Sequence, residues 1–243
     1  MIQSQKVWEI EEQDEQLIKQ LSSQLNISSI AAKILIARGC DSPEQAASLL
    51  KIDESQYHDP SLMAGMKEAI TRIEEALENG EKILVYGDYD ADGITSTTVL
   101  MNALLDIGAD VSFVIPDRFT HGYGPNEELF RKAYADGVNL IITVDNGISG
   151  IEQVKIAREL GMDVIITDHH EPGDVLPDAN VIIHPRIPEG HYPFAELAGV
   201  GVAFKLAHAL YGEIPDHLFE YVAIGTIADL VPLVGENRYL VQR

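Results

Sequence analysis

The feature that most constrains the fold is a change of pattern near residue 81. From there on, short apolar runs rich in β-branched residues alternate with segments of helical periodicity. Such alternation predicts an α/β fold, a doubly wound, mostly parallel sheet with flanking helices. The predicted strands cover residues 83–86, 111–115, 140–144, 164–167 and 181–183, and the predicted helices lie near 94–107, 126–136, 149–160, 200–211 and 216–227.

The chain before this change is predicted to be helical. Ser42-Pro43-Glu44-Gln45 reads as a capping box with proline at the first helical position. A second helix is expected over 62–79, ending at Gly80. We therefore predict two parts, a helical N-terminal region at 1–80 and an α/β domain at 81–243.

Composition limits the classes of function. None of the apolar runs in the 243 residues approaches the ~18 residues that a bilayer-spanning helix needs, so we predict a cytoplasmic protein without a membrane partner. Cys40 is the only cysteine, which excludes disulfides within the chain and cysteine-based zinc sites. The formal net charge of -22 means that any grip on a polyanion must depend on a few local groups.

Acids and histidines follow three of the predicted strands. Asp88, Asp90 and Asp92 come after the first, Asp145 after the third, and Asp168-His169-His170 after the fourth. Ligands of open α/β sheets bind beyond the carboxyl ends of the strands, so these side chains are expected at one rim. Carboxylates and imidazoles without sulfur suit Mn²⁺ or Mg²⁺. Two such ions, about 3.5–4 Å apart, favour transfer of a phosphoryl group to water.

The aspartate triplet has other interpretations. Asp-x-Asp-x-Asp-Gly also opens a calcium-binding EF-hand loop, but the twelfth position, which should be Glu, is Val99, and a strand rather than a helix precedes it. Aspartyl-nucleophile phosphatases place Thr or Val where this chain has Asp92. A solvated turn, and a helix cap or core position for His169 and His170, stay open as structural interpretations.

Four ordered motifs resemble those of the DHH phosphoesterase superfamily. They are Asp88-Tyr-Asp-Ala-Asp-Gly, Val144-Asp-Asn-Gly, Asp168-His-His and Gly225-Thr-Ile-Ala-Asp229. Segments 115–126 and 197–205 are similar to the RecJ family of single-stranded-DNA-specific 5′→3′ exonucleases, and the similarity begins near His58. The resemblance implies a metal-dependent phosphodiesterase that releases 5′-mononucleotides from single-stranded DNA during recombination and repair.

The resemblance also implies roles for residues. Asp88 and Asp90 would hold one Mn²⁺ or Mg²⁺ ion, and Asp92, His169 and Asp229 a second, with Asp145 bridging the two. His170 would point to the opposite side from His169 and help at the scissile phosphate, while Asp168 orients the histidine pair. The expected contacts with DNA are Arg118, His121, Tyr123, Gly124 and Asn146. The partners implied are single-stranded DNA, a single-strand-binding protein and a RecQ-type helicase.

Several alternatives remain at this stage. Another DHH phosphoesterase acting on oligoribonucleotides, cyclic dinucleotides or pyrophosphate shares the motifs, and a non-catalytic RecJ-like scaffold or a calcium-binding module belongs to a different class. Gly199-Val-Gly201 before a helix offers amides to a phosphate or, equally, allows tight packing.

DHH enzymes normally continue into a second domain, DHHA1, and members of the RecJ family add an OB-fold. Neither is apparent in the sequence, so we expect a fragment with weak activity.

Overall fold

The computed structural model describes residues 12–51, 53–187 and 190–243, and its chain divides into two compact units, Met1–Asp53 and Glu54–Arg243. The described part of the first unit consists of α1 (Glu15–Leu25), α2 (Ser29–Ala37) and α3 (Pro43–Leu50). These helices share a small core of their own, formed by Ile18, Leu21, Ala32, Leu35, Cys40 and Ala46.

The cap of α3 differs in one bond from the predicted capping box. Ser42 Oγ accepts from the Gln45 amide at 3.3 Å, as expected. The Gln45 side chain, however, accepts from the Asp41 amide at 2.7 Å, one residue before the cap. The cap therefore ties down the chain that enters α3, as well as its first turn.

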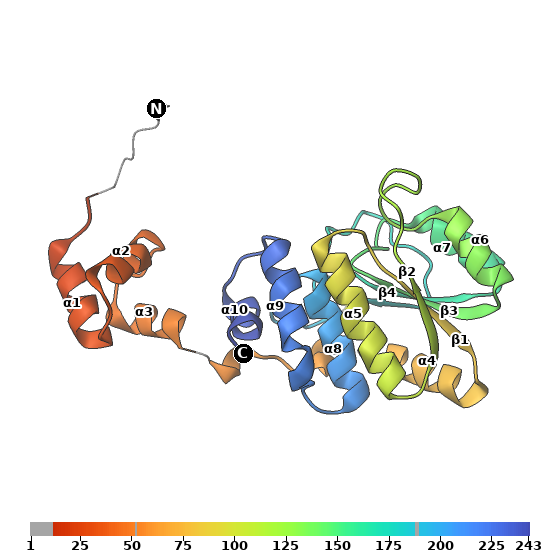
Figure 1. Ribbon diagram of the computed structural model, residues 1–243, viewed down its shortest axis with the longest axis horizontal. Helices are drawn as coiled ribbons and strands as arrows, with labels where there is room; N and C mark the ends of the chain where they lie inside the picture. The colour runs from red at the N-terminus through yellow and green to blue at the C-terminus, as the bar shows by residue number, and fades with distance from the viewer. Residues whose placement is uncertain (1–11, 52, 188–189) are drawn as a thin grey trace, which may run out of the picture. The chain divides into compact units, whose positions relative to one another are not determined.

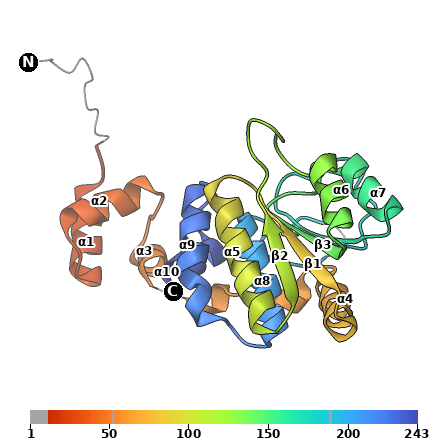
Figure 2. The same cartoon turned by 45° about the vertical axis from the view of Figure 1, so that its right-hand side comes forward.

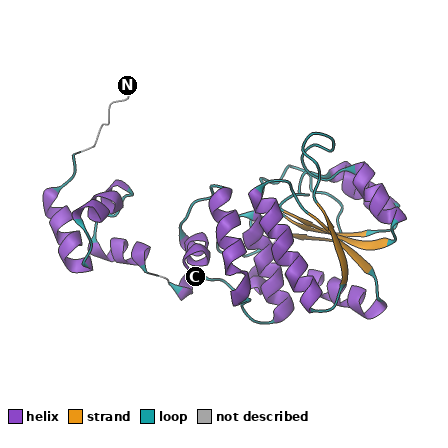
Figure 3. Cartoon of the chain, viewed as in Figure 1, coloured by secondary structure: helices purple, strands orange, loops and turns teal. Residues whose placement is uncertain are grey.

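The second unit contains one parallel sheet with helices around it (Figures 1 and 3). The strands pair in the order β2-β1-β3-β4-β5, and every pairing is parallel. The strands are β1 (Lys82–Tyr86), β2 (Asp110–Val114), β3 (Val138–Val144), β4 (Asp163–Thr167) and β5 (Val181–Ile183). The helices are α4 (Met66–Asn79), α5 (Ala91–Asp106), α6 (Glu127–Ala135), α7 (Ile151–Glu159), α8 (Gly199–Tyr211), α9 (Phe219–Ala228) and α10 (Gly235–Gln242).

Alternate side chains of the strands enter two separate cores. Ile83 and Val85 of β1 pack with α4, α5, α8 and α9 on one face of the sheet. Leu84 and Tyr86 pack with α6 and α7 on the other face. These two helices lie at the right of Figure 2. Because both faces are covered along β1, β3, β4 and β5, most positions of these strands are apolar, which is why they appeared in the sequence as continuous runs.

The α/β prediction is confirmed, and the strand ends agree to within one or two residues. The predicted helix at 62–79 is shorter, because Gly65 adopts φ 76° and α4 begins only at Met66. The sequence division at residue 80 marks where strand patterns begin. The compact unit in the structure begins at Glu54, and α4 contributes Met66, Ala69 and Ile73 to the core beneath the sheet.

The order of the strands fixes where a ligand can bind. The chain leaves β1 through α5 to β2 on one side, then returns through α6 to β3 on the other side of β1. The two connections diverge at the carboxyl ends of β1 and β3, where a crevice opens in folds of this kind. Asp88 and Asp145 follow these two strands directly.

A buried ion pair joins the beginning and end of the second unit. Lys205 of α8 and Glu236 of α10 are both fully buried and contact each other. Glu236 also accepts from the His58 amide at 3.0 Å and from the Tyr192 hydroxyl at 2.5 Å. Lys205 lies over the Tyr57 ring, 3.3 Å from its centroid. The pair is thus surrounded by hydrogen bonds that offset part of the cost of burying two charges.

We predict that Glu236→Ala lowers the free energy of unfolding by about 3–5 kcal/mol, because it leaves Lys205 as an unpaired buried charge. Denaturant unfolding of the two proteins measures this. The matched control is Glu127→Ala, which breaks the exposed pair with Arg131 and should cost no more than about 0.5 kcal/mol. Equal effects of the two substitutions would contradict the prediction.

Candidate metal centre

Acidic and imidazole side chains gather where the carboxyl ends of β1, β3 and β4 meet. Asp88, Asp92 and Asp145 are each no more than 2% exposed, and His169 is 7% exposed. Three overlapping sets have potential ligand atoms within 4.8 Å of one another: Asp88, Asp90 and Asp145; Asp92, His169 and Asp229; Asp145, His169 and His170. Asp229, at the end of α9, thus joins a cluster whose other members follow strands.

The cluster contains buried polar atoms that fit a cation. His169 Nε2 lies 3.1 Å from Asp145 Oδ1 and 3.8 Å from Asp229 Oδ2. Neither His169 Nε2 nor Asp145 Oδ1 has a hydrogen-bond partner among the described residues, although both atoms are buried. Buried polar atoms are normally paired, so these two converge as ligands would around a metal ion.

The electrostatics of the cluster point the same way. Burial, with Asp90 as the next cause, raises the pKa of Asp145 to about 9. Burial and the nearby Asp145 carboxylate raise the pKa of Asp92 well above its usual range. Burial also raises the pKa of Asp88 and Asp229. A divalent cation stabilises the ionised form of carboxylates whose pKa is raised in this way. Oxygen donors of this kind are the ligands that Mn²⁺ and Mg²⁺ accept.

Asp145 has a special backbone conformation. Its φ is 61°, in the left-handed region that few residues other than glycine adopt, although aspartate is among those that do. Its amide donates to the Thr167 carbonyl at 3.0 Å, which ties the turn after β3 to the end of β4. The unusual backbone conformation at this turn directs the Asp145 side chain toward the other acids.

Two glycines let helices approach the acids closely. A Cβ atom on Gly199, at the start of α8, would lie 2.4 Å from Asp145 Oδ1. A Cβ atom on Gly225, in α9, would lie 2.8 Å from Asp92 Oδ1. Any larger residue at either place would displace a carboxylate. The segments that carry these glycines were noted in the sequence, but their proximity to the acids was not.

His170, Asp168 and Tyr123 form a second layer beside the acids. Asp168 Oδ1 accepts from His170 Nδ1 at 2.7 Å, and its other oxygen accepts from the Ile148 amide at 2.9 Å. The Tyr123 hydroxyl lies 3.0 Å from His170 Nε2. The Asp168 hydrogen bond raises the pKa of His170 to about 9. Although burial opposes it, the bonds that His170 and Ile148 donate lower the pKa of Asp168.

The expectation that His169 and His170 point to opposite sides is wrong. Their ring centroids are 4.4 Å apart and tilted by 55°. Side chains alternate only within a strand, and β4 ends at Thr167, before either histidine. Hydrogen bonds from both amides to Asp168 Oδ1 turn the chain there, so both imidazoles face the centre.

The remaining predicted contacts with DNA differ in placement. Arg118 lies over the ring of Tyr89, 5.5 Å from its centroid, beside the first motif. His121 Nδ1 accepts from the Asp117 amide within its own loop. Gly124 accepts from the Tyr86 hydroxyl through its carbonyl. Asn146 is 1% exposed and its side chain donates to the carbonyls of Val144 and Tyr86. Its contact with substrate, and that of Gly124, stay predictions.

Sequence reasoning missed His184. This residue follows β5 and is 1% exposed. Its Nδ1 accepts from the Arg186 amide at 3.0 Å, so Nε2 carries the proton and donates to the His170 carbonyl at 2.7 Å. The rule that placed the other residues at strand ends, applied to 181–183 as well, predicts this position. The amide of Ile148, which holds Asp168, left no signal in the sequence.

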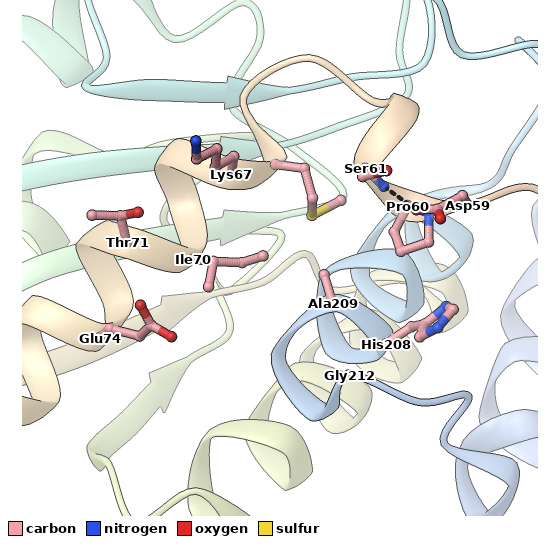
Figure 4. Close-up of a pocket in the computed structure, with 11 residues that line it drawn as sticks. Asp59, Pro60, Ser61, Lys67, Ile70, Thr71, Glu74, His208, Ala209 and Gly212 are labelled. Atoms are coloured by element: carbon pink, nitrogen blue, oxygen red, sulfur yellow. Dashed lines mark hydrogen bonds between the residues drawn. The ribbon is translucent and has the colours of Figure 1, made fainter.

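A separate pocket of about 530 Å³ lies between α4 and the end of α8 (Figure 4). Lys67, Ile70, Thr71 and Glu74 line it from α4, and His208 and Ala209 from α8. It contains none of the acids gathered at the strand ends.

In the described residues, no helix combines the length and apolar character of a membrane span.

The fold and the cluster define a doubly wound α/β protein with a divalent-metal centre at its switch point. The chain belongs to the DHH family, because residues 82–226 match the DHH family, N-terminal domain. The resemblance to RecJ is confirmed as well. The chain is 55% identical over 240 residues to the single-stranded-DNA-specific exonuclease RecJ of Bacillus subtilis (strain 168). The aligned region covers 99% of this chain and 30% of that protein.

Further relatives agree. RecJ of Escherichia coli (strain K12) is 42% identical over 194 residues, 73% of this chain and 34% of that protein. The chain therefore spans about a third of the length of these curated relatives. A crystal structure of exonuclease RecJ bound to manganese is 40% identical with a TM-score of 0.68, over 74% of this chain and 47% of that one. A crystal structure of RecJ from Thermus thermophilus in complex with Mn²⁺ is 32% identical with a TM-score of 0.70, over 95% and 33%.

We predict that Gly199→Ala lowers both stability and Mn²⁺ affinity, because the new Cβ atom would overlap Asp145 Oδ1. The cost should be about 1–3 kcal/mol of unfolding free energy, with Mn²⁺ binding weakened at least about tenfold. Thermal unfolding and Mn²⁺ titration measure the two effects. Gly173→Ala is the control, since its Cβ atom would lie 3.7 Å from the nearest atom.

We predict that the protein in EDTA loses stability as the pH rises from 5 to 9. The raised pKa of Asp145, about 9, means that the folded state holds a proton that the unfolded state releases near pH 4. That stabilisation is complete below the unfolded pKa and is lost as the pH rises through the folded one. Melting temperatures across this range should decline, less steeply for Asp145→Asn. A rise with pH in EDTA would contradict the assignment.

Proposed function

We propose that this chain is the DHH part of a metal-dependent exonuclease that degrades single-stranded DNA from its 5′ end. The observation that carries the proposal is the convergence of Asp145 Oδ1 and His169 Nε2, which are buried 3.1 Å apart and have no hydrogen bond to a described residue, in a chain 55% identical to a single-stranded-DNA-specific exonuclease. All the acids of the four motifs are present, which disfavours a scaffold without activity.

We propose that the acids and His169 hold two Mn²⁺ or Mg²⁺ ions. Asp88, Asp90 and Asp145 would surround one ion and Asp92, His169 and Asp229 the second, with Asp145 between them, which the proximity of their ligand atoms supports. When bound, such ions make water a stronger nucleophile and stabilise charge on the phosphate oxygens. Asp92 was assigned to the second ion from the sequence and lies 3.9 Å from His169 Nε2.

His170 is proposed to act on the scissile phosphate. Its pKa of about 9 keeps the imidazole protonated near neutral pH, and Asp168 holds Nδ1, so Nε2 is the atom left to face substrate. There it donates a hydrogen bond to the phosphate or a proton to the departing 3′ oxygen. The Tyr123 hydroxyl beside Nε2 restricts the orientation of the ring.

The loop that carries Arg118, His121 and Tyr123 is proposed to receive the DNA end. Tyr123 is 53% exposed and Phe119 is 92% exposed, so both rings can stack against bases. Arg118 supplies positive charge next to Tyr89. Stacking rather than base-edge contacts would explain a preference for single strands. With a net charge of -22, binding to the phosphates of DNA depends on local positive groups such as this one.

The product and the setting follow from the family alone. We propose release of 5′-mononucleotides, work in recombination and repair in the cytoplasm, and cooperation with a single-strand-binding protein and a RecQ-type helicase. These elements rest on the resemblance to RecJ and on no contact within this chain.

We predict that the chain degrades 5′- and 3′-labelled single strands from the 5′ end in Mn²⁺, and that EDTA abolishes this. Asp145→Ala should lower the rate at least about 100-fold, as removal of one charge-stabilising group typically does. Asp174→Ala, at an exposed acid, is the control and should leave the rate unchanged.

Other outcomes separate the alternatives. Activity that survives EDTA or Asp145→Ala would overturn the metal mechanism. Degradation from the 3′ end would overturn the polarity alone. A preference for pyrophosphate, dinucleotides or cyclic dinucleotides over long single strands would assign the chain to another group of DHH phosphoesterases.

A further inference from the structure

His170 is held at two ends by two different residues. Asp168 Oδ1 accepts from the His170 amide at 3.1 Å and from its ring Nδ1 at 2.7 Å. The carbonyl of His170 accepts from His184 Nε2 at 2.7 Å. The first two bonds share one oxygen atom, so alone they would let the residue pivot about it. The third bond comes from another part of the fold and stops that rotation.

The sheet places His184 beside this carbonyl. β5 pairs with β4 in parallel, with Ile183 beside Thr167, so the residues that follow the two strands are neighbours. The Asp168 amide donates to the Ile183 carbonyl at 3.3 Å and continues this pairing past the strand ends. His184 therefore reaches the His170 backbone from a strand that supplies none of the acids of the centre.

The Arg186 amide fixes which nitrogen of His184 carries the proton. It donates to Nδ1 at 3.0 Å, so Nδ1 is the acceptor and Nε2 is the donor. The other tautomer would lose both hydrogen bonds. Burial lowers the pKa of His184, which is 1% exposed, so the neutral ring with one proton is favoured. His184 is thus a fixed donor directed at one carbonyl.

The segment that carries His184 is itself anchored. Arg186 Nε donates to the Ala195 carbonyl at 3.1 Å, in the segment that leads into α8. Arg186 also donates to the Glu171 carboxylate at 2.8 Å, but Glu171 is 83% exposed, and an exposed pair adds little. The bond to Ala195 joins two backbone segments and keeps His184 from moving with the chain after His170.

The ring that has to be positioned is the exposed one. The side chain of His170 is 41% exposed, whereas His184 is buried. An exposed side chain keeps rotational freedom that must be removed before it can act at a fixed point. Groups that act on a substrate need to be held within about 0.5 Å of the productive position. A bond to the backbone of His170 provides such a restraint without covering its ring.

We propose that His184 is a positioning residue, which holds the backbone of His170 so that the His170 ring faces the substrate phosphate. The proposal deepens the proposed function and rests on it for the role of His170. His184 itself touches neither substrate nor ion, and it acts through one backbone carbonyl.

The test compares His184→Asn with His184→Gln in Mn²⁺-dependent degradation of 5′-labelled single strands. Asn keeps an oxygen for the Arg186 amide but is too short to reach the His170 carbonyl, whereas Gln carries an amide group to the place of Nε2. We expect His184→Asn to lower kcat about 10–100-fold with little change in KM, as loss of an outer hydrogen-bond partner typically does. His184→Gln should recover most of the rate. His191→Asn, at an exposed histidine, is the control and should leave the rate unchanged.

A double-mutant cycle separates positioning from a purely structural role. In the His170→Ala background, where no ring remains to be positioned, His184→Asn should lower kcat no further. Rates are compared per folded molecule, with the folded fraction taken from thermal unfolding. A further loss of the same size, or equal losses in His184→Asn and His184→Gln, would overturn the proposal.

A crystal structure of His184→Asn without metal gives a readout that does not depend on activity. The His170 ring should move by on the order of 1 Å from its place beside the Tyr123 hydroxyl, a displacement large enough to account for the lost rate. An unmoved ring would refute the proposal. If the wild type degrades no DNA, the proposed function fails, and this structure still decides whether His184 positions His170.

Nuclear magnetic resonance of the wild type covers the case in which His184→Asn does not fold. In EDTA, the Nε2 proton of His184 should exchange with water far more slowly than the ring proton of the exposed His191, because it is buried and hydrogen-bonded. A proton found on Nδ1, or equally fast exchange in the two histidines, would contradict the proposed role.

Discussion

Repulsion among buried carboxylates is the constraint on which the rest of this structure depends. Asp88, Asp92 and Asp145 are almost fully buried within one cluster, and each has a raised pKa. Carboxylates can be buried together in this way only where protons, hydrogen bonds from amides, or cations balance their negative charge. All three occur here: burial raises the pKa of Asp145 to about 9, two helix amides donate to Asp92, and the potential ligand atoms converge as they would around a cation.

The surroundings place neighbouring acids in opposite states. Asp168 is as buried as Asp145, yet its pKa is lowered, because His170 and the Ile148 amide donate to it. Asp145 Oδ1 has no hydrogen-bond donor among the described residues, and the Asp145 backbone adopts a φ of 61°. Titratable groups whose pKa values are pushed apart in this way serve different roles, one as a fixed anion and the other as a group that responds to metal.

Several elements were predictable because their causes are local. The alternation of strands and helices, the cap of α3 and the convergence of Asp88, Asp145 and His169 all follow from periodicity and from the rule of strand ends. The orientation of His169 and His170 was not, because it depends on amides that bond to Asp168 after β4 has ended. The burial of Asn146 likewise depends on carbonyls of β1 and β3 that become neighbours only in the sheet.

The sequence by itself determined the class of fold and the composition of the centre, since residue types and strand patterns are local properties. Only the tertiary structure decided which acid does what. Asp92 looks like its two neighbours in the motif, yet its oxygens meet α8 amides that lie more than a hundred residues away. The packing of the helices brings these distant amides close to the acids, and two glycines allow the close approach. No residue spacing within the motif encodes this proximity.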